Sequence, residues 1–131
     1  MASPGSEREA VHAAGAPAAI GPYSHAVRVG ELLLCSGQIP LDPASGEIVG
    51  ESASDQARRC LENLQAVCEA AGTSLQRAAR LTVYMTDLGA FAEVNEVYGS
   101  FFGKDPPARV AIGVAALPRG AQVEIDAIVA L

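Results

Sequence analysis

Two strand-like runs near the C-terminal end, at 110–114 and 122–129, restrict how this chain can fold; the first is apolar and rich in β-branched residues. Pro and Gly residues punctuate both runs, and a Leu-Pro-Arg-Gly turn separates them, which is typical of two strands of one sheet. Arg109 stands at the mouth of the first run and Glu124 near the start of the second. If both runs are strands of one sheet, the positions of Arg109 and Glu124 are set by that sheet.

Arg109 and Glu124 form the candidate site. A guanidinium binds a carboxylate through two parallel hydrogen bonds, and a nearby carboxylate can orient or deprotonate a water. The alternative is a cross-strand ion pair on a solvated face, which contributes little to stability. The spacing of the two residues favours that structural role, so both interpretations stay open at this point.

Composition narrows the class of protein. A chain of 131 residues, half of them apolar, suits one globular domain with one core. The net charge of −6, with Lys104 as the only lysine and no basic run, disfavours nucleic-acid binding. Cys35, Cys60 and Cys68 lack metal-ligand spacing and are predicted to be reduced core thiols, which fits a cytoplasmic protein. No apolar stretch approaches the roughly 20 residues that cross a bilayer, so no membrane association is expected.

Residues 1–16 lack a clear period and are predicted to be a flexible leader before a single domain at 17–131. Tyr23 follows a Gly-Pro pair on a loop beside the first strand; packing is the usual role of such a tyrosine, and catalysis is the alternative. Gly37 follows a strand, where glycine lets a ligand or another backbone approach, although tight packing is the more common reason.

Periodicity and capping residues predict the remaining elements. They are a hairpin at 26–29 and 32–36, a helix at 52–71, a strand at 79–85 and a helix at 90–102. The order β-β-α-β-α-β-β predicts a two-layer α+β domain with both helices on one face of the sheet. The run 110–114 is apolar on both of its faces, so we expect self-association to cover the second face. Clefts between subunits would then hold Arg109 and Glu124.

Six segments, in this order and spacing, resemble the RidA/YjgF family of enamine/imine deaminases. They are 16–24, 36–43, 60–64, 91–95, 107–109 and 117–125. The resemblance implies a chorismate-mutase-like α+β fold, assembled as a homotrimer with a central barrel and sites at the subunit interfaces. It also implies hydrolysis of 2-aminoacrylate-type enamines and imines, made by PLP enzymes, to 2-keto acids and ammonia.

The resemblance assigns roles to individual residues. Arg109 falls on the arginine that binds the substrate carboxylate, Glu124 on the water-activating glutamate, and Tyr23 on a tyrosine that is a candidate proton donor. The other implied pocket residues are Ser36, Gly37, Ala111 and Phe91. An imine carbon is already electrophilic, so no metal and no cofactor are expected.

Two features depart from the family's pattern. His25 stands where many relatives carry Gln, either as a polar loop residue or as a neighbour that tunes Tyr23. The connection 103–106 is shorter than in typical members, which trims a pocket wall and leaves the substrate range open.

Three other functions are alternatives to a deaminase. A carboxylate-binding protein on the same fold would use Arg109 without turnover. The endoribonuclease or translation-inhibitor role of some relatives is disfavoured by the charge of −6. A chaperone-like role would not depend on Arg109.

Overall fold

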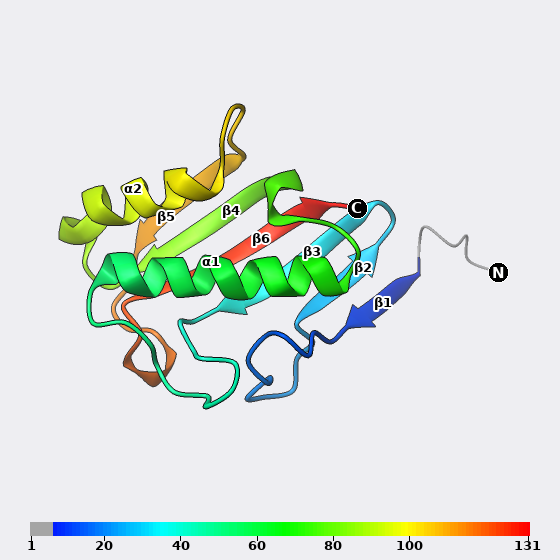
Figure 1. The fold of residues 1–131 in the computed structure, drawn as a ribbon, viewed down its shortest axis with the longest axis horizontal. Coiled ribbons are helices and arrows are strands. Elements are labelled where there is room, and N and C mark those ends of the chain that lie inside the picture. The colour runs from blue at the N-terminus through cyan, green and yellow to red at the C-terminus, as the bar shows by residue number, and fades with distance from the viewer. Residues whose placement is uncertain (1–6) are drawn as a thin grey trace.

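Six strands and two helices make up residues 7–131, the part of the chain that the computed structural model describes (Figure 1). The strands are β1 (Arg8–Val11), β2 (Ala26–Val29), β3 (Leu32–Gln38), β4 (Ala78–Met85), β5 (Ala108–Gly113) and β6 (Val123–Ala130). They form one sheet in the order β1-β2-β3-β6-β4-β5, in which only the β4–β5 pair is parallel. The chorismate-mutase-like α+β fold that the sequence predicts is confirmed.

Helix α1 (Ala53–Ala70) begins and ends within one residue of the predicted bounds, 52–71. The hydroxyl of Ser52 accepts a hydrogen bond from the Asp55 backbone N–H at 3.1 Å, which caps the first turn. Gly72 follows the last turn with a φ of 83°, a left-handed conformation that glycine adopts without strain. Leu61 and Leu64 of the apolar stripe are fully buried.

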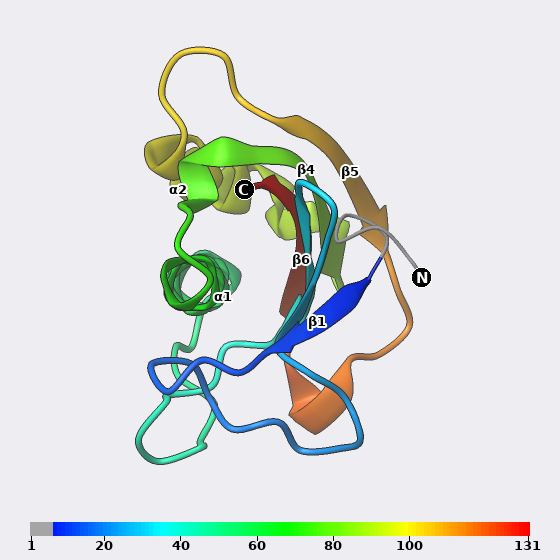
Figure 2. The same ribbon diagram turned by 90° about the vertical axis from the view of Figure 1, so that its right-hand side faces the viewer.

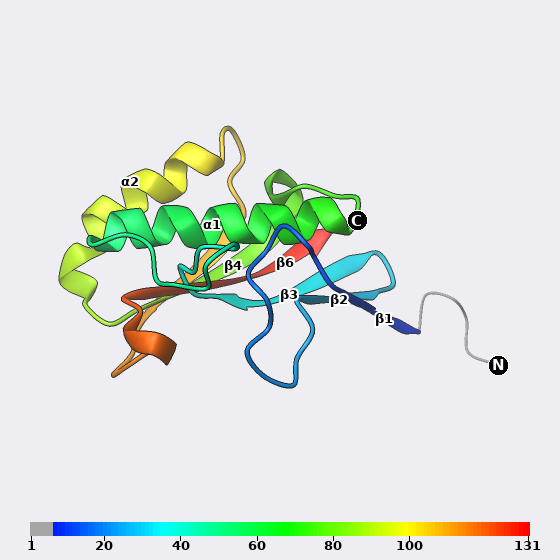
Figure 3. The same ribbon diagram turned by 60° about the horizontal axis from the view of Figure 1, so that its bottom comes forward.

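Helix α2 (Phe91–Phe101) connects β4 to β5 and lies beside α1. Figures 2 and 3 show both helices on the same side of the sheet. Residues alternate along β6, so that Val123 and Ile125 are buried beneath the helices while Glu124 is directed to the other face. The predicted two-layer arrangement is therefore confirmed.

The second face of the sheet exposes large apolar side chains. Leu32, Leu34, Val110 and Ile112 are each 40–46% exposed. Neither α1 nor α2 covers this face. Exposed apolar area of this kind is typical of an interface, and the predicted trimer stays a prediction that a single chain does not test.

The N-terminal segment differs from its prediction as a flexible leader. Arg8–Val11 forms β1, which pairs antiparallel with β2 at the edge of the sheet, and Val11, Ala13 and Ala16 are buried. The prediction is therefore wrong for residues 8–16, because pairing with a distant strand orders a segment that has no period of its own. Residues 1–6 of the predicted leader lie outside the described residues.

Cys35, Cys60 and Cys68 are free thiols buried in the core, as predicted. Within the described range, neither helix combines the length and the apolar character that crossing a membrane requires.

Candidate active site

Arg109 lies on β5, at the edge of the sheet, on the side that faces α2. Its pairing with buried Leu81 of β4 fixes that side. The guanidinium carbon lies 4.9 Å from the ring centre of Tyr98 and 5.2 Å from that of Phe91, and Nη1 donates a hydrogen bond to Oδ1 of Asn95 at 2.6 Å. Cation–π contacts and this bond orient the group. Among the described residues Asn95 is its only hydrogen-bond partner, so several N–H donors remain for a carboxylate.

Glu124 lies on β6 and is directed to the opposite face of the sheet. Its carboxylate lies directly over Gly37 of β3, where a Cβ on the glycine would collide with Oε2 and stand 3.0 Å from Cδ. Tight packing, the more common of the two reasons considered for Gly37, therefore applies. The packed group is the candidate catalytic carboxylate itself.

The surroundings of Glu124 change its acidity. Partial burial raises the pKa of Glu124 above its ordinary value, and the charge of Asp126 raises that pKa further. Asp126 lies on the same face two residues along β6 and accepts a hydrogen bond from the Tyr84 hydroxyl at 2.9 Å. A carboxylate with a raised pKa is a stronger base in its ionised form.

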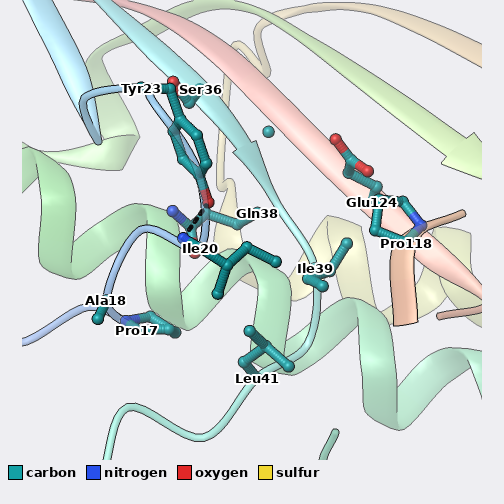
Figure 4. Close-up of a pocket in the computed structure, with 11 residues that line it drawn as sticks. Pro17, Ala18, Ile20, Tyr23, Ser36, Gln38, Ile39, Leu41, Pro118 and Glu124 are labelled. Carbon is teal, nitrogen blue, oxygen red and sulfur yellow. Dashed lines mark hydrogen bonds between the residues drawn. The ribbon is translucent and has the colours of Figure 1, made fainter. Parts of the chain in front are cut away.

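Glu124 shares a cavity of about 370 Å³ with Tyr23, Ser36 and Gly37 (Figure 4). Tyr23 comes from the loop before β2, and its hydroxyl accepts a long hydrogen bond of 3.4 Å from the Ile20 backbone N–H. Tyr23 is 43% exposed, so it is not a core packing residue. Apolar walls come from Pro17, Ile20, Ile39, Leu41 and Pro118.

A second cavity, which we call the α2 cavity, has a volume of about 510 Å³ and opens beside Arg109. One wall is the C-terminal half of α2, and the other is the connection between α2 and β5. Its lining includes Asn95, Tyr98, Gly99, Phe102, Gly103 and Pro106. The two cavities share no lining residue.

The chain divides the predicted site between the two faces of the sheet. Arg109, Phe91 and Ala111 gather on the helix side; Ala111 pairs with buried Val83 of β4, which fixes its side. Tyr23, Ser36, Gly37 and Glu124 gather around the other cavity. β4 separates β5 from β6, so the alternative of a cross-strand ion pair between Arg109 and Glu124 is wrong for this chain.

His25 ties the N-terminal segment to the sheet. It is 5% exposed, and its Nδ1 accepts a hydrogen bond from the Ala13 backbone N–H at 2.8 Å. Nε2 therefore carries the proton and donates to the Pro17 carbonyl at 2.7 Å. Because Pro17 and Ala18 line the first cavity, His25 holds part of its wall, which is a larger role than that of a polar loop residue.

Asn95 and Tyr98 are the contacts of Arg109 that the sequence analysis did not single out. Asn95 lies four residues after Phe91, and Tyr98 three residues after Asn95, so all three project from neighbouring turns of α2. The periodicity that predicts the helix at 90–102 carries no indication of these contacts. The sequence did carry one signal. Asn95 is an amide among the apolar residues of the predicted helix, and only a short connection separates that helix from the strand that carries Arg109.

The two cavities offer different chemical groups. A partly buried carboxylate and a phenol in the first cavity are groups that can act as a base and a proton donor, and the oriented guanidinium at the α2 cavity is a group that can bind a carboxylate. Across residues 7–131 no cluster of three or more His, Cys, Asp or Glu side chains is placed to hold a metal ion. The fold and the two cavities thus define a two-layer α+β protein with two candidate small-molecule sites.

Comparisons with known proteins extend this class to a family. Residues 13–131 match the family model described as Endoribonuclease L-PSP. The chain is 53% identical to RutC family protein y4sK of Sinorhizobium fredii, over 88% of this chain and 92% of that protein. It is 45% identical to the mouse protein named 2-iminobutanoate/2-iminopropanoate deaminase, over 92% of this chain and 90% of that protein.

The solved structure of Escherichia coli TdcF with bound serine is similar as well, with a TM-score of 0.87 and 41% identity. The similarity covers 94% of this chain and 98% of TdcF. The protein therefore belongs to the RidA/YjgF/RutC family, as the six sequence segments predicted.

Proposed function

We propose that the protein hydrolyses 2-imino acids, and the enamines in equilibrium with them, to 2-keto acids and ammonia. The observation that carries this proposal is the placement of Glu124, a carboxylate with a raised pKa that lies over Gly37 in a cavity shared with Tyr23. The names of the mouse, bovine and human relatives, all 2-iminobutanoate/2-iminopropanoate deaminases, support the same chemistry.

We infer that each site is completed by two copies of the chain. Within one chain, β4 separates the strands that carry Arg109 and Glu124, and the two side chains are directed to opposite faces of the sheet. The apolar second face, with Leu34 and Ile112 exposed, favours a partner. A homotrimer in which Arg109 of one copy meets the Glu124 cavity of the next would unite the two halves.

The proposed reaction starts with Arg109 binding the carboxylate of the imine. Glu124 takes a proton from water as the water oxygen bonds to C2, and Tyr23 gives a proton to the imine nitrogen. The hydroxyl of the resulting carbinolamine then returns its proton to Tyr23, while Glu124 passes its proton to the nitrogen. The C–N bond breaks, and ammonia and the 2-keto acid leave with both residues restored.

The alternative is a protein that binds small carboxylates without turnover. E. coli TdcF has been solved with bound serine, which carries a carboxylate, and this supports the alternative that the protein binds such ligands without turnover. The two functions differ at Glu124. A deaminase loses its rate in Glu124→Gln and keeps carboxylate binding, whereas a binding protein has no rate to lose.

A coupled assay tests the proposal. A PLP-dependent dehydratase generates 2-iminobutanoate, and release of the 2-keto acid is followed with the wild type, Arg109→Ala and Glu124→Gln. We expect acceleration over the spontaneous rate by the wild type only. Equal rates with and without the wild type would contradict deamination, and calorimetry with 2-oxobutanoate would then examine carboxylate binding.

A further inference from the structure

The α2 cavity is not used by the proposed chemistry, although it begins at the group that would hold the substrate. Arg109 and Asn95 stand at one end, and the cavity continues past Gly99 to Gly103. Asn95 and Gly99 lie four positions apart on α2, roughly 6 Å along the helix axis, and the lining continues past the end of the helix to Gly103. A side chain attached to a bound carboxylate has space to extend along that length.

The walls of the α2 cavity are suited to an apolar group. Phe102 and Tyr98 form its deeper side, and Pro106 and Pro107 form the side that leads into β5. The Tyr98 hydroxyl is itself buried, so the part of this residue that the wall presents is its aromatic ring. Burial of apolar area is therefore the main contribution that this cavity offers a ligand.

Two exposed glycines belong to the lining of the α2 cavity. A Cβ at Gly99 or at Gly103 would meet no atom within 4 Å. The connection from α2 to β5 is short, because only residues 103–107 lie between Phe102 and Ala108. The open volume of about 510 Å³ exceeds the needs of a methyl or ethyl side chain.

We propose that the α2 cavity is a specificity subsite for the side chain of the substrate, and that it selects 2-imino acids with branched or aromatic apolar side chains. The inference rests on the proposed function, since it takes Arg109 as the carboxylate clamp. Arg109 fixes the carboxylate at the mouth of the cavity, and the side chain occupies the space beside Gly99. The competing location for the side chain is the apolar wall of the first cavity, at Ile39 and Leu41.

The test is a substitution that reduces the volume of the α2 cavity. It is made at Gly99, a lining position where a larger residue can be accepted. The Cβ of Gly99→Leu would meet no atom within 4 Å, so the backbone position accepts a larger residue. Its matched control is Ser100→Leu, an exposed neighbour on the same helix that does not line the cavity. Imines of leucine and alanine, released by an amino-acid oxidase, serve as large and small substrates.

We expect Gly99→Leu to lower kcat/KM for the leucine-derived imine about 10-fold or more, with little change for the alanine-derived imine. Ser100→Leu should leave both values within about twofold of the wild type. An equal loss for both imines, or no loss for either, would overturn the proposal. A selective loss in Ile39→Phe but not in Gly99→Leu would move the side chain to the first cavity.

Failure of the proposed function gives a different result, because the wild type would then accelerate neither imine. The subsite is still tested in that case by binding of the stable 2-keto acids. Calorimetry should show that 4-methyl-2-oxopentanoate binds the wild type more tightly than pyruvate does, and that Gly99→Leu removes the difference. Equal affinities in the wild type would contradict the subsite independently of turnover.

Discussion

The carboxylate of Glu124 fills the space over Gly37 that a Cβ would need. The two residues lie on neighbouring strands, β6 and β3, so the contact depends on the sheet order and not on nearness in the sequence. A glycine in this strand thus sets the position of the candidate base.

Gly37→Ala is predicted to displace Glu124. A displacement of about 1 Å can lower a catalytic rate on the order of 100-fold, and forcing a methyl group into a filled space costs about 1–3 kcal/mol of unfolding free energy. Deaminase rates and urea unfolding measure the two effects. Gly15→Ala is the control, because its Cβ would stand at an ordinary 3.7 Å from its nearest neighbour. Wild-type activity in Gly37→Ala would contradict the assigned position of Glu124.

The raised pKa of Glu124 predicts opposite pH trends for stability and activity. The folded state binds the Glu124 proton more tightly than the unfolded chain, so this residue's contribution to stability is present at low pH and is lost as pH rises through the folded-state pKa. Denaturant unfolding of the wild type and Glu124→Gln should therefore show Glu124→Gln gaining relative stability between pH 4 and pH 7.

Activity should fall on the acid side, through a pKa above the ordinary range of glutamate, because protonated Glu124 cannot accept a proton from water. The pH profile of kcat/KM measures this limb. A limb at or below the usual glutamate pKa would disagree with the burial of this carboxylate.

Asn95→Ala is predicted to make the guanidinium of Arg109 less well oriented. The guanidinium would keep its contacts with Phe91 and Tyr98 and lose its hydrogen bond, a loss of about 1 kcal/mol or roughly fivefold in affinity. The KM for imines should rise more than kcat falls. Glu96→Ala, the next exposed position on α2, is the control, and an equal effect there would show that Asn95 has no specific role.

His25→Leu is predicted to release the segment that carries Pro17. Two backbone groups would lose their partners, at a cost of about 1–3 kcal/mol each. His25→Gln should restore most of the stability, because an amide can accept from Ala13 and donate to Pro17. Amide hydrogen exchange at Ala13 and unfolding in urea measure the change, and equal behaviour of the two variants would contradict the two-bond role.

The local elements could be predicted from the sequence because their signals are local. The helix predicted at 52–71 is observed at Ala53–Ala70, since its apolar period, its Ser52 cap and Gly72 act within a few residues. β1 has no such signal: of its four residues only Val11 is buried, and the strand exists because β2 offers it an edge.

The site residues could be chosen from the sequence, but their arrangement could not. Arg109 and Glu124 lie on consecutive strands of the chain, which suggests that they are neighbours. The sheet inserts β4 between β5 and β6 and directs the two side chains to opposite faces. Strand order depends on non-local pairing, which residue patterns do not encode.

Mixing two inactive variants tests whether one site takes Arg109 from one copy of the chain and Glu124 from another. Arg109→Ala and Glu124→Gln would be unfolded together and refolded as mixed oligomers. In a randomly mixed trimer about a quarter of the sites combine a native Arg109 with a native Glu124, so about a quarter of the wild-type activity should return. No recovery, with mixed oligomers present by native mass spectrometry, would contradict a site shared between copies.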